Sequence, residues 1–201
     1  MKKYRLKLGR WPEIRAEQTG IDFPILALLF LCFLLGSVLG CFVGSGVEEE
    51  TEEITKLISQ SPDSDIIGYL HSLWQASRYH IVVLLAATSL IGVFVIPLTA
   101  FLRGYFLTCA AAAVITALPE HGILAALISC GIGALLTIPS LFLLQLDGFA
   151  LSKRLRALSA GKSGHFSNQN IPQHMGIAVV CLITAAATDH MLIPWLLSYI
   201  F

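Results

Sequence analysis

Charge is the property that this chain has least of. Only 13% of its 201 residues are charged, divided equally between 13 basic and 13 acidic side chains. A soluble domain carries about a quarter of its residues as charges, because it must cover its surface with them. Here 56% of the residues are hydrophobic and the mean hydropathy is +0.76. The composition excludes a soluble globular domain and predicts a small membrane protein.

Catalytic signatures are also missing. The chain has no HExxH, GxSxG, P-loop or GxGxxG motif, and its six histidines are scattered without the spacing of metal ligands. Its five cysteines are an odd number and none forms CxxC, which argues against a disulfide framework and against a zinc site. We therefore predict a protein that is not an enzyme, with no catalytic residue, no metal and no cofactor.

Long apolar runs are what the chain does have. A membrane-spanning helix needs about 20 predominantly apolar residues. Five windows qualify by length and composition, at 23–44, 81–101, 105–118, 122–146 and 175–200. They predict an all-α polytopic bundle of five transmembrane helices. The rest would be a basic tail at 1–22, an external acidic and amphipathic segment at 45–80, and a basic loop at 151–174.

One charge interrupts the longest apolar stretch, in the sequence AFLRGYFL at 100–107. A single helix from Ile81 to Leu118 would be roughly 57 Å long, whereas the hydrocarbon core of a bilayer is about 30 Å thick. The chain must therefore turn within this stretch. We expect Arg103 and Gly104 to form the tip of a hairpin at the membrane surface.

The distribution of basic residues predicts the orientation. Eleven basic residues lie on one side of the predicted membrane: those before the first span, Arg103, and those between spans four and five. Only two, Lys56 and Arg78, fall on the other side. The positive-inside rule places the N terminus in the cytoplasm and, after five crossings, Phe201 outside. The short basic tail is an orientation signal with a secondary role in binding anionic lipid, and nucleic acid is not an expected partner.

Small residues recur at helical spacing in two of the predicted spans. Gly36, Gly40 and Gly44 share one face of the first span, and Gly133 lies on a small-residue stripe of the fourth. Such faces let neighbouring backbones approach closely, although glycine is also simply common in membrane helices. We predict helix packing at these four glycines. The oligomeric state stays open, and a homo-oligomer is possible.

Asp189 and His190 form a polar pair within the last span, in AAATDHMLIPW. Ionisable residues at this depth are costly and often functional. The alternative is that Pro194 breaks the helix and that the pair satisfies the backbone groups set free. Both interpretations of this candidate intramembrane polar site stay open.

Four segments together resemble a known family, the stage II sporulation protein M family. They are FLLGSVLG (33–40), SLIGVFVIPLTAFLRGYFL (89–107), HGILAALISCGIGALLTIPSLFLL (121–144) and AAATDHMLIPWL (185–196). The second is similar to the family's central hairpin, in which an apolar span ends in an F-[LI]-[KR]-G tip. The others are similar to its first, fourth and closing spans.

The resemblance implies a non-enzymatic scaffold in the cell membrane. In spore formers this family anchors two peptidoglycan-degrading partners, the stage II sporulation proteins D and P. It holds them at the septum during engulfment of the forespore. The alternative is a permease or transport subunit, in which Asp189, His190 and the prolines at 97, 139 and 194 line a route.

Overall fold

The computed structural model of the chain describes residues 23–46, 66–118, 121–160 and 171–197. The predicted tail at 1–22 lies outside the described residues, as do 47–65 and 161–170 of the two predicted extramembrane segments. Every regular element in the described ranges is helical. The predicted all-α class is confirmed for this part of the chain.

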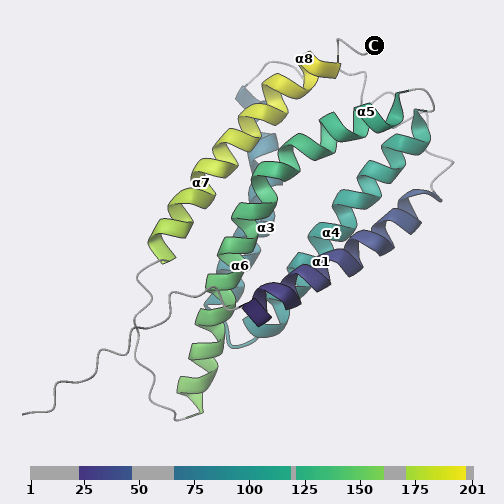
Figure 1. The fold of residues 1–201 in the computed structure, drawn as a ribbon. Coiled ribbons are helices and arrows are strands. Elements are labelled where there is room, and N and C mark those ends of the chain that lie inside the picture. The colour runs from purple at the N-terminus through teal and green to yellow at the C-terminus, as the bar shows by residue number, and fades with distance from the viewer. Residues whose placement is uncertain (1–22, 47–65, 119–120, 161–170, 198–201) are drawn as a thin grey trace, which may run out of the picture.

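Five helical rods make up the described part of the fold (Figure 1). The first three are α1 (Phe23–Gly44), α3 (Ile66–Ala87) and α4 (Gly92–Ala117). The fourth is continuous through α5 (Gly122–Ala126), a π-helical turn η1 (Leu127–Gly131) and α6 (Ile132–Ser159). The fifth joins α7 (Ile171–Ala187), a second π-helical turn η2 (Thr188–Leu192) and α8 (Ile193–Leu197).

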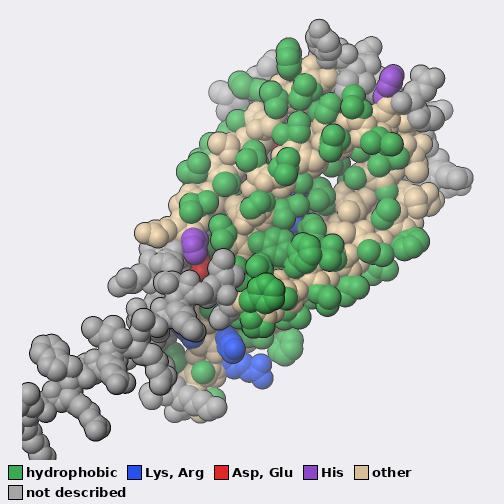
Figure 2. Space-filling view, viewed as in Figure 1, with side chains coloured by type: hydrophobic (Ala, Val, Ile, Leu, Met, Phe, Trp, Pro, Cys, Tyr) green, Lys and Arg blue, Asp and Glu red, His purple; other side chains and the backbone are tan. Residues whose placement is uncertain are grey.

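The rods alternate in direction along the chain, so that α1 and α4 run parallel to each other (Figure 1). Helix α1 packs almost entirely on α4, whereas α3 and α6 contact each other and each also contacts α4 and α7. A cluster of buried residues marks the end where α1 and α4 begin and α3 finishes. It contains Ile25, Leu29, Ala86, Ile96 and Phe149. The basic end of α6 projects from this end of the bundle, where Lys and Arg side chains gather in Figure 2.

Hydrophobic side chains are spread over the face of the bundle seen in Figure 2, and many large hydrophobic residues of the described helices are exposed. Four described helices are long and apolar enough to cross a membrane: α1, α4, the rod at 122–159 and the segment at 173–192. Helix α3 has the same length as α1, 22 residues, but is more polar. The structure therefore supports a membrane protein with four candidate spans, and the predicted count of five is not established.

The predicted hairpin tip at Arg103 and Gly104 is wrong. Helix α4 runs without a break from Gly92 to Ala117 and contains both residues. The chain turns at 88–91 instead, where the Thr88 hydroxyl donates to Leu85 O and the Ser89 amide to Ala86 O. Hydroxyl side chains favour such turns because they bond nearby backbone groups. The prediction failed because it treated a charged residue as incompatible with the middle of an apolar helix. In the structure, side chains of the helices next to α4 contact this charge.

Several predicted boundaries move with this correction. The window at 81–101 is divided among the end of α3, the turn and the first half of α4, and the window at 105–118 is the second half of α4. From Ile66 onward the segment predicted as external belongs to α3, which continues to Ala87. Helix α6 extends past 146 to Ser159, and the last rod begins at Ile171.

Candidate functional site

The first candidate region is the contact between α1 and α4, where three predicted glycines meet backbone. A Cβ atom added at Gly36, Gly40 or Gly44 would fall on the carbonyl oxygen of Phe101, Tyr105 or Cys109, respectively. The four-residue step is the same on both helices, which fixes a parallel register. Because no side chain separates the helices, their backbones touch at three successive turns.

Helix α4 also contributes small residues to this contact. A Cβ added at Gly104 would meet Phe33 O of α1, and the Ala112 methyl group lies against Gly44. Between them the Thr108 hydroxyl donates to Ser37 O across the interface at 2.8 Å and approaches its own Gly104 O at 2.9 Å. Gly104, predicted at a hairpin tip, is thus a packing residue, and the α1–α4 contact is made of small side chains and backbone.

The second candidate region is a polar cluster between α3, α4 and α6. Arg103 of α4 donates from Nη2 to the Thr137 hydroxyl of α6 at 3.0 Å. Its guanidinium carbon also lies 5.2 Å from the ring centroid of Tyr79 on α3, a cation–π distance. Arg103 therefore connects three helices in the interior of the bundle rather than marking a membrane surface.

The cluster continues along α6 through hydroxyl groups. Thr137 donates to Gly133 O at 2.9 Å, and the Ser140 hydroxyl donates to Thr137 O at 3.0 Å. His80 of α3, only 3% exposed, has its Nε2 atom 3.0 Å from Ser140 Oγ. One stripe of α6 thus carries Gly133, Thr137 and Ser140 toward the polar groups of α3 and α4.

Asp189 and His190 lie in η2 but face different neighbours. A Cβ at Gly133 would stand 2.7 Å from Asp189 Oδ1, so this glycine makes room for the carboxyl group. Oδ1 is buried without a hydrogen-bond partner among the described residues. The ring of His190 instead packs edge-on to Tyr69 of α3, with centroids 6.1 Å apart. The predicted pair is therefore divided between α6 and α3.

The helix does not break at Pro194. It widens into the π-helical turn η2 directly before α8, and Asp189 and His190 lie in that turn. A proline removes one backbone donor and crowds the preceding turn, and π-helical turns are common at functional positions. Asp189 and Arg103 also interact electrostatically, although they form no ion pair within hydrogen-bonding distance.

Two further polar contacts lie toward the basic end. Gln145 of α6 is fully buried and donates from Nε2 to the Thr99 hydroxyl of α4 at 3.2 Å. Asp147 Oδ2 lies 2.6 Å from Nδ1 of His174 on α7. This contact is an ion pair when His174 is protonated. Both contacts hold neighbouring rods together.

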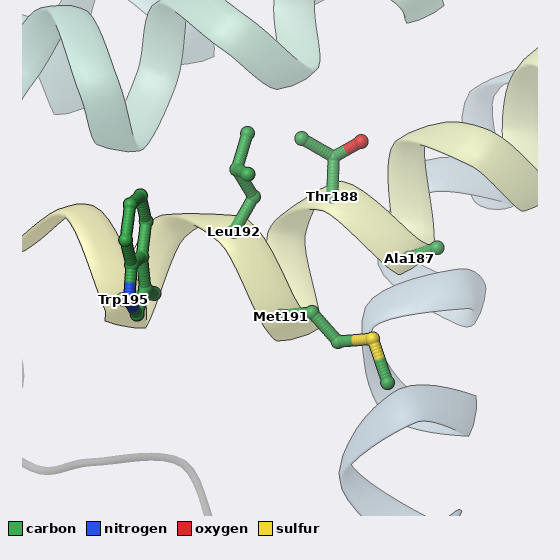
Figure 3. A pocket seen from close by; sticks show the side chains of 5 residues that line it. All are labelled: Ala187, Thr188, Met191, Leu192 and Trp195. Carbon is green, nitrogen blue, oxygen red and sulfur yellow. The ribbon is translucent and has the colours of Figure 1, made fainter.

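The geometry offers little reactive chemistry. Within the described ranges, no group of three or more His, Cys, Asp or Glu residues could hold a metal ion. An open groove of about 320 Å³ runs along η2 and α8, lined by Ala187, Thr188, Met191, Leu192 and Trp195 (Figure 3). Its one hydroxyl, on Thr188, donates to Thr184 O at 2.7 Å. The groove is an apolar surface, and the region where polar groups converge is the cluster around Arg103.

Sequence reasoning missed three members of that cluster. Tyr79 and His80 were assigned to an external segment, and Ser140 was passed over next to Pro139. The available signal was the period of the stripe on α6, since Gly133, Thr137 and Ser140 follow at spacings of four and three. Extending the predicted stripe by one turn would have found Ser140. Nothing local pointed to Tyr79.

A bundle of long apolar helices with a polar interior is the architecture of a helical membrane protein. The family model for Stage II sporulation protein M matches residues 29–191, so the chain belongs to this family. The matched range contains both the α1–α4 contact and the cluster around Arg103. Comparison with curated proteins and with solved structures found no significant match.

Proposed function

We propose that the chain is a non-enzymatic scaffold of the cell membrane that recruits and localises peptidoglycan-remodelling proteins. The observation that carries the proposal is the family match over residues 29–191, which spans the bundle from α1 to η2. Membership in this family indicates a sporulation-related membrane protein. The specific partners we propose are the stage II sporulation proteins D and P, held at the septum during engulfment of the forespore.

The packing of the bundle is compatible with a scaffold. A scaffold needs a defined shape in the membrane, and the backbone contact of α1 with α4 fixes one register for two helices. The internal polar contacts, such as Arg103 with Thr137 and Gln145 with Thr99, join the remaining rods. The one described contact between a serine and a histidine side chain, Ser140 with His80, is buried among them, with the two residues 2% and 3% exposed.

We further propose that all five rods cross the membrane, with the N terminus in the cytoplasm and the C terminus outside. Arg78 and Arg103 lie inside the rods, so neither counts as a loop charge. Of the remaining basic residues, ten precede α1 or lie between residues 151 and 170, and only Lys56 lies on the other side. The charge asymmetry is therefore stronger than the loop assignment from sequence indicated.

Topology is tested by cysteine accessibility. In a variant whose five native cysteines are replaced, a single cysteine at Ser61 should react with an impermeant maleimide in intact cells. A cysteine at Ser163 should react only after the cells are permeabilised. Equal labelling of the two positions in intact cells would disprove the N-in, five-crossing arrangement.

Localisation tests the function. In the source organism we would image fluorescent fusions of its D- and P-type wall hydrolases with and without the gene for this chain. We expect deletion to disperse at least one fusion from its membrane site, and re-expression of the chain to restore it. Unchanged localisation of both hydrolases in the deletion strain would reject the scaffold proposal.

A further inference from the structure

The outer face of α3 differs from the other exposed surfaces of the bundle. Beside the exposed Leu70, four exposed residues follow at helical spacing in the middle of the helix, His71, Trp74, Gln75 and Arg78, and Trp74 is 63% exposed. We call these four residues the α3 outer face. The exposed face of α1 carries only apolar side chains at the corresponding positions, such as Phe30, Leu34 and Val38. Lipid suits the face of α1, but it does not suit the α3 outer face.

Arg78 lies at the middle level of the bundle. Its Nη2 donates to the Tyr79 hydroxyl at 3.3 Å, and its guanidinium carbon is 4.9 Å from the Tyr79 ring centroid. The guanidinium group of Arg103 lies over the same ring, and Arg103 is the twelfth of the 26 residues of α4. Helix α4 is about 39 Å long, so Arg103 and the groups around it fall near the centre of a bilayer about 30 Å thick.

The charges at this level do not balance. Two guanidinium groups share the ring of Tyr79, and Asp189 is the only described carboxylate near them. Asp189 faces Gly133 of α6, and no described carboxylate lies within ion-pair distance of Arg78. A charge at the bilayer centre is costly unless it faces a polar interior or pairs with an opposite charge. Arg78 therefore needs a counter-ion, and the described part of the chain does not supply one.

A second copy of the chain would not supply it either. Two copies joined face to face through α3 would bring their Arg78 side chains together. The one described mid-level carboxylate, Asp189, has its Oδ1 buried in the space that Gly133 leaves on α6, turned away from the α3 outer face. Charge complementarity instead requires a different protein whose helix carries Asp or Glu at the same depth.

We propose that the α3 outer face is the docking surface for a membrane-spanning helix of another protein, whose mid-bilayer carboxylate pairs with Arg78. Trp74, one turn from Arg78, would pack on the apolar side of that helix. Gln75 would hydrogen-bond beside the ion pair. The inference rests on two parts of the proposed function: a scaffold must hold a membrane partner, and α3 must be one of the helices that cross the membrane.

A synthetic helix provides a defined probe. The full-length chain, with the photoreactive residue p-benzoylphenylalanine in place of Trp74, is reconstituted into phosphatidylcholine vesicles with a Leu/Ala helix of about 22 residues. Three such helices differ only in their central residue, which is Glu, Gln or Leu. We expect the Glu helix to crosslink at least tenfold more than the Leu helix, with the Gln helix closer to Leu.

Matched variants show whether Arg78 causes the preference. Arg78→Lys should retain it and Arg78→Leu should abolish it, with elution from a sizing column reporting that each variant is folded. The same photoreactive residue in place of Phe30 on α1, which is 54% exposed, should crosslink the three helices equally. This control separates the α3 outer face from general contact with lipid-facing surfaces.

Three results would overturn the proposal: equal crosslinking of the Glu and Leu helices by the folded parent chain, a Glu preference that survives Arg78→Leu, or crosslinks mainly between two copies of the chain. None of them would alter the outcome of hydrolase localisation in cells. Conversely, hydrolases that localise without the chain would reject the scaffold role while leaving the Glu preference intact. The two proposals therefore fail separately.

Discussion

The two faces of α4 show two ways of packing a membrane helix. Toward α1 it presents Gly104 and Thr108, and the backbones of the two helices touch. Toward α3 and α6 it presents Arg103, which reaches out to Tyr79 and Thr137. Gly104 follows Arg103 directly, yet the two residues serve opposite kinds of contact because successive residues on a helix point about 100° apart.

The α1–α4 contact and the polar contacts of Arg103 differ in the substitutions that they tolerate. The α1–α4 contact depends on the absence of side chains, so any added atom must displace a backbone. The polar contacts are made by side chains with several donors and acceptors, which can rearrange when one group changes. We therefore expect substitutions at the glycines to be the most damaging, and substitutions in the polar contacts to differ according to what they leave unpaired.

Gly40→Leu should have the largest effect. The new side chain would overlap Tyr105 O and the Thr108 hydroxyl, so that α1 must move away from α4. Overpacking of this kind costs about 3 kcal/mol or more where backbone blocks the way. Membrane abundance and thermal stability in detergent should both fall. Val38→Leu, on the exposed face of the same helix, is the control, and equal stability of the two variants would contradict the backbone contact.

Thr137→Val tests the polar side of the comparison. It keeps the shape of the side chain but removes the acceptor of Arg103 and the bond to Gly133 O. We expect a loss of about 1–3 kcal/mol, the usual consequence of leaving a buried polar group without its partner. Thr116→Val is the matched control, because that hydroxyl bonds only carbonyls of its own helix. If both variants unfold at the same temperature, the Arg103–Thr137 contact does not stabilise the bundle.

Asp189→Asn should change little. The amide keeps the shape next to Gly133 and removes a charge whose Oδ1 has no hydrogen-bond partner among the described residues. Abundance and hydrolase localisation should match the parent chain, whereas Asp189→Ala leaves a void and should lose about 1–3 kcal/mol. Normal abundance with complete loss of function in Asn, and retained function in Asp189→Glu, would show that the charge itself works and would favour the transport alternative.

Gln145→Leu should have the smallest effect. Its Oε1 is buried without a partner, and the Thr99 hydroxyl keeps its bond to Ile96 O after the amide is removed. Replacing a partly satisfied polar group with an apolar one of similar volume is often nearly neutral, within about 0.5 kcal/mol. Gln145→Ala is the control for lost volume. A large drop in stability for Leu but not for Ala would mean that Gln145 has a role beyond packing.

Much of the coarse organisation could be predicted, because hydropathy is a local property. Four of the five rods lie within or across predicted apolar windows, and the family resemblance is confirmed over residues 29–191. The prediction failed at the polar helix α3, whose residues 66–80 were assigned to an external segment. A helix with Gln75, Arg78 and His80 has no strong hydropathy signal. Only its contacts with the neighbouring helices stabilise it inside the bundle.

The sequence by itself determined that this is a helical membrane protein with a glycine face at Gly36, Gly40 and Gly44, since composition and helical period are written in successive residues. Only the tertiary structure decided where the charges go. Arg103 is tolerated inside α4 because Thr137, 34 residues away in the chain, accepts its hydrogen bond. The cost of a charge in a membrane depends on its partners in space, and no window of neighbouring sequence contains them.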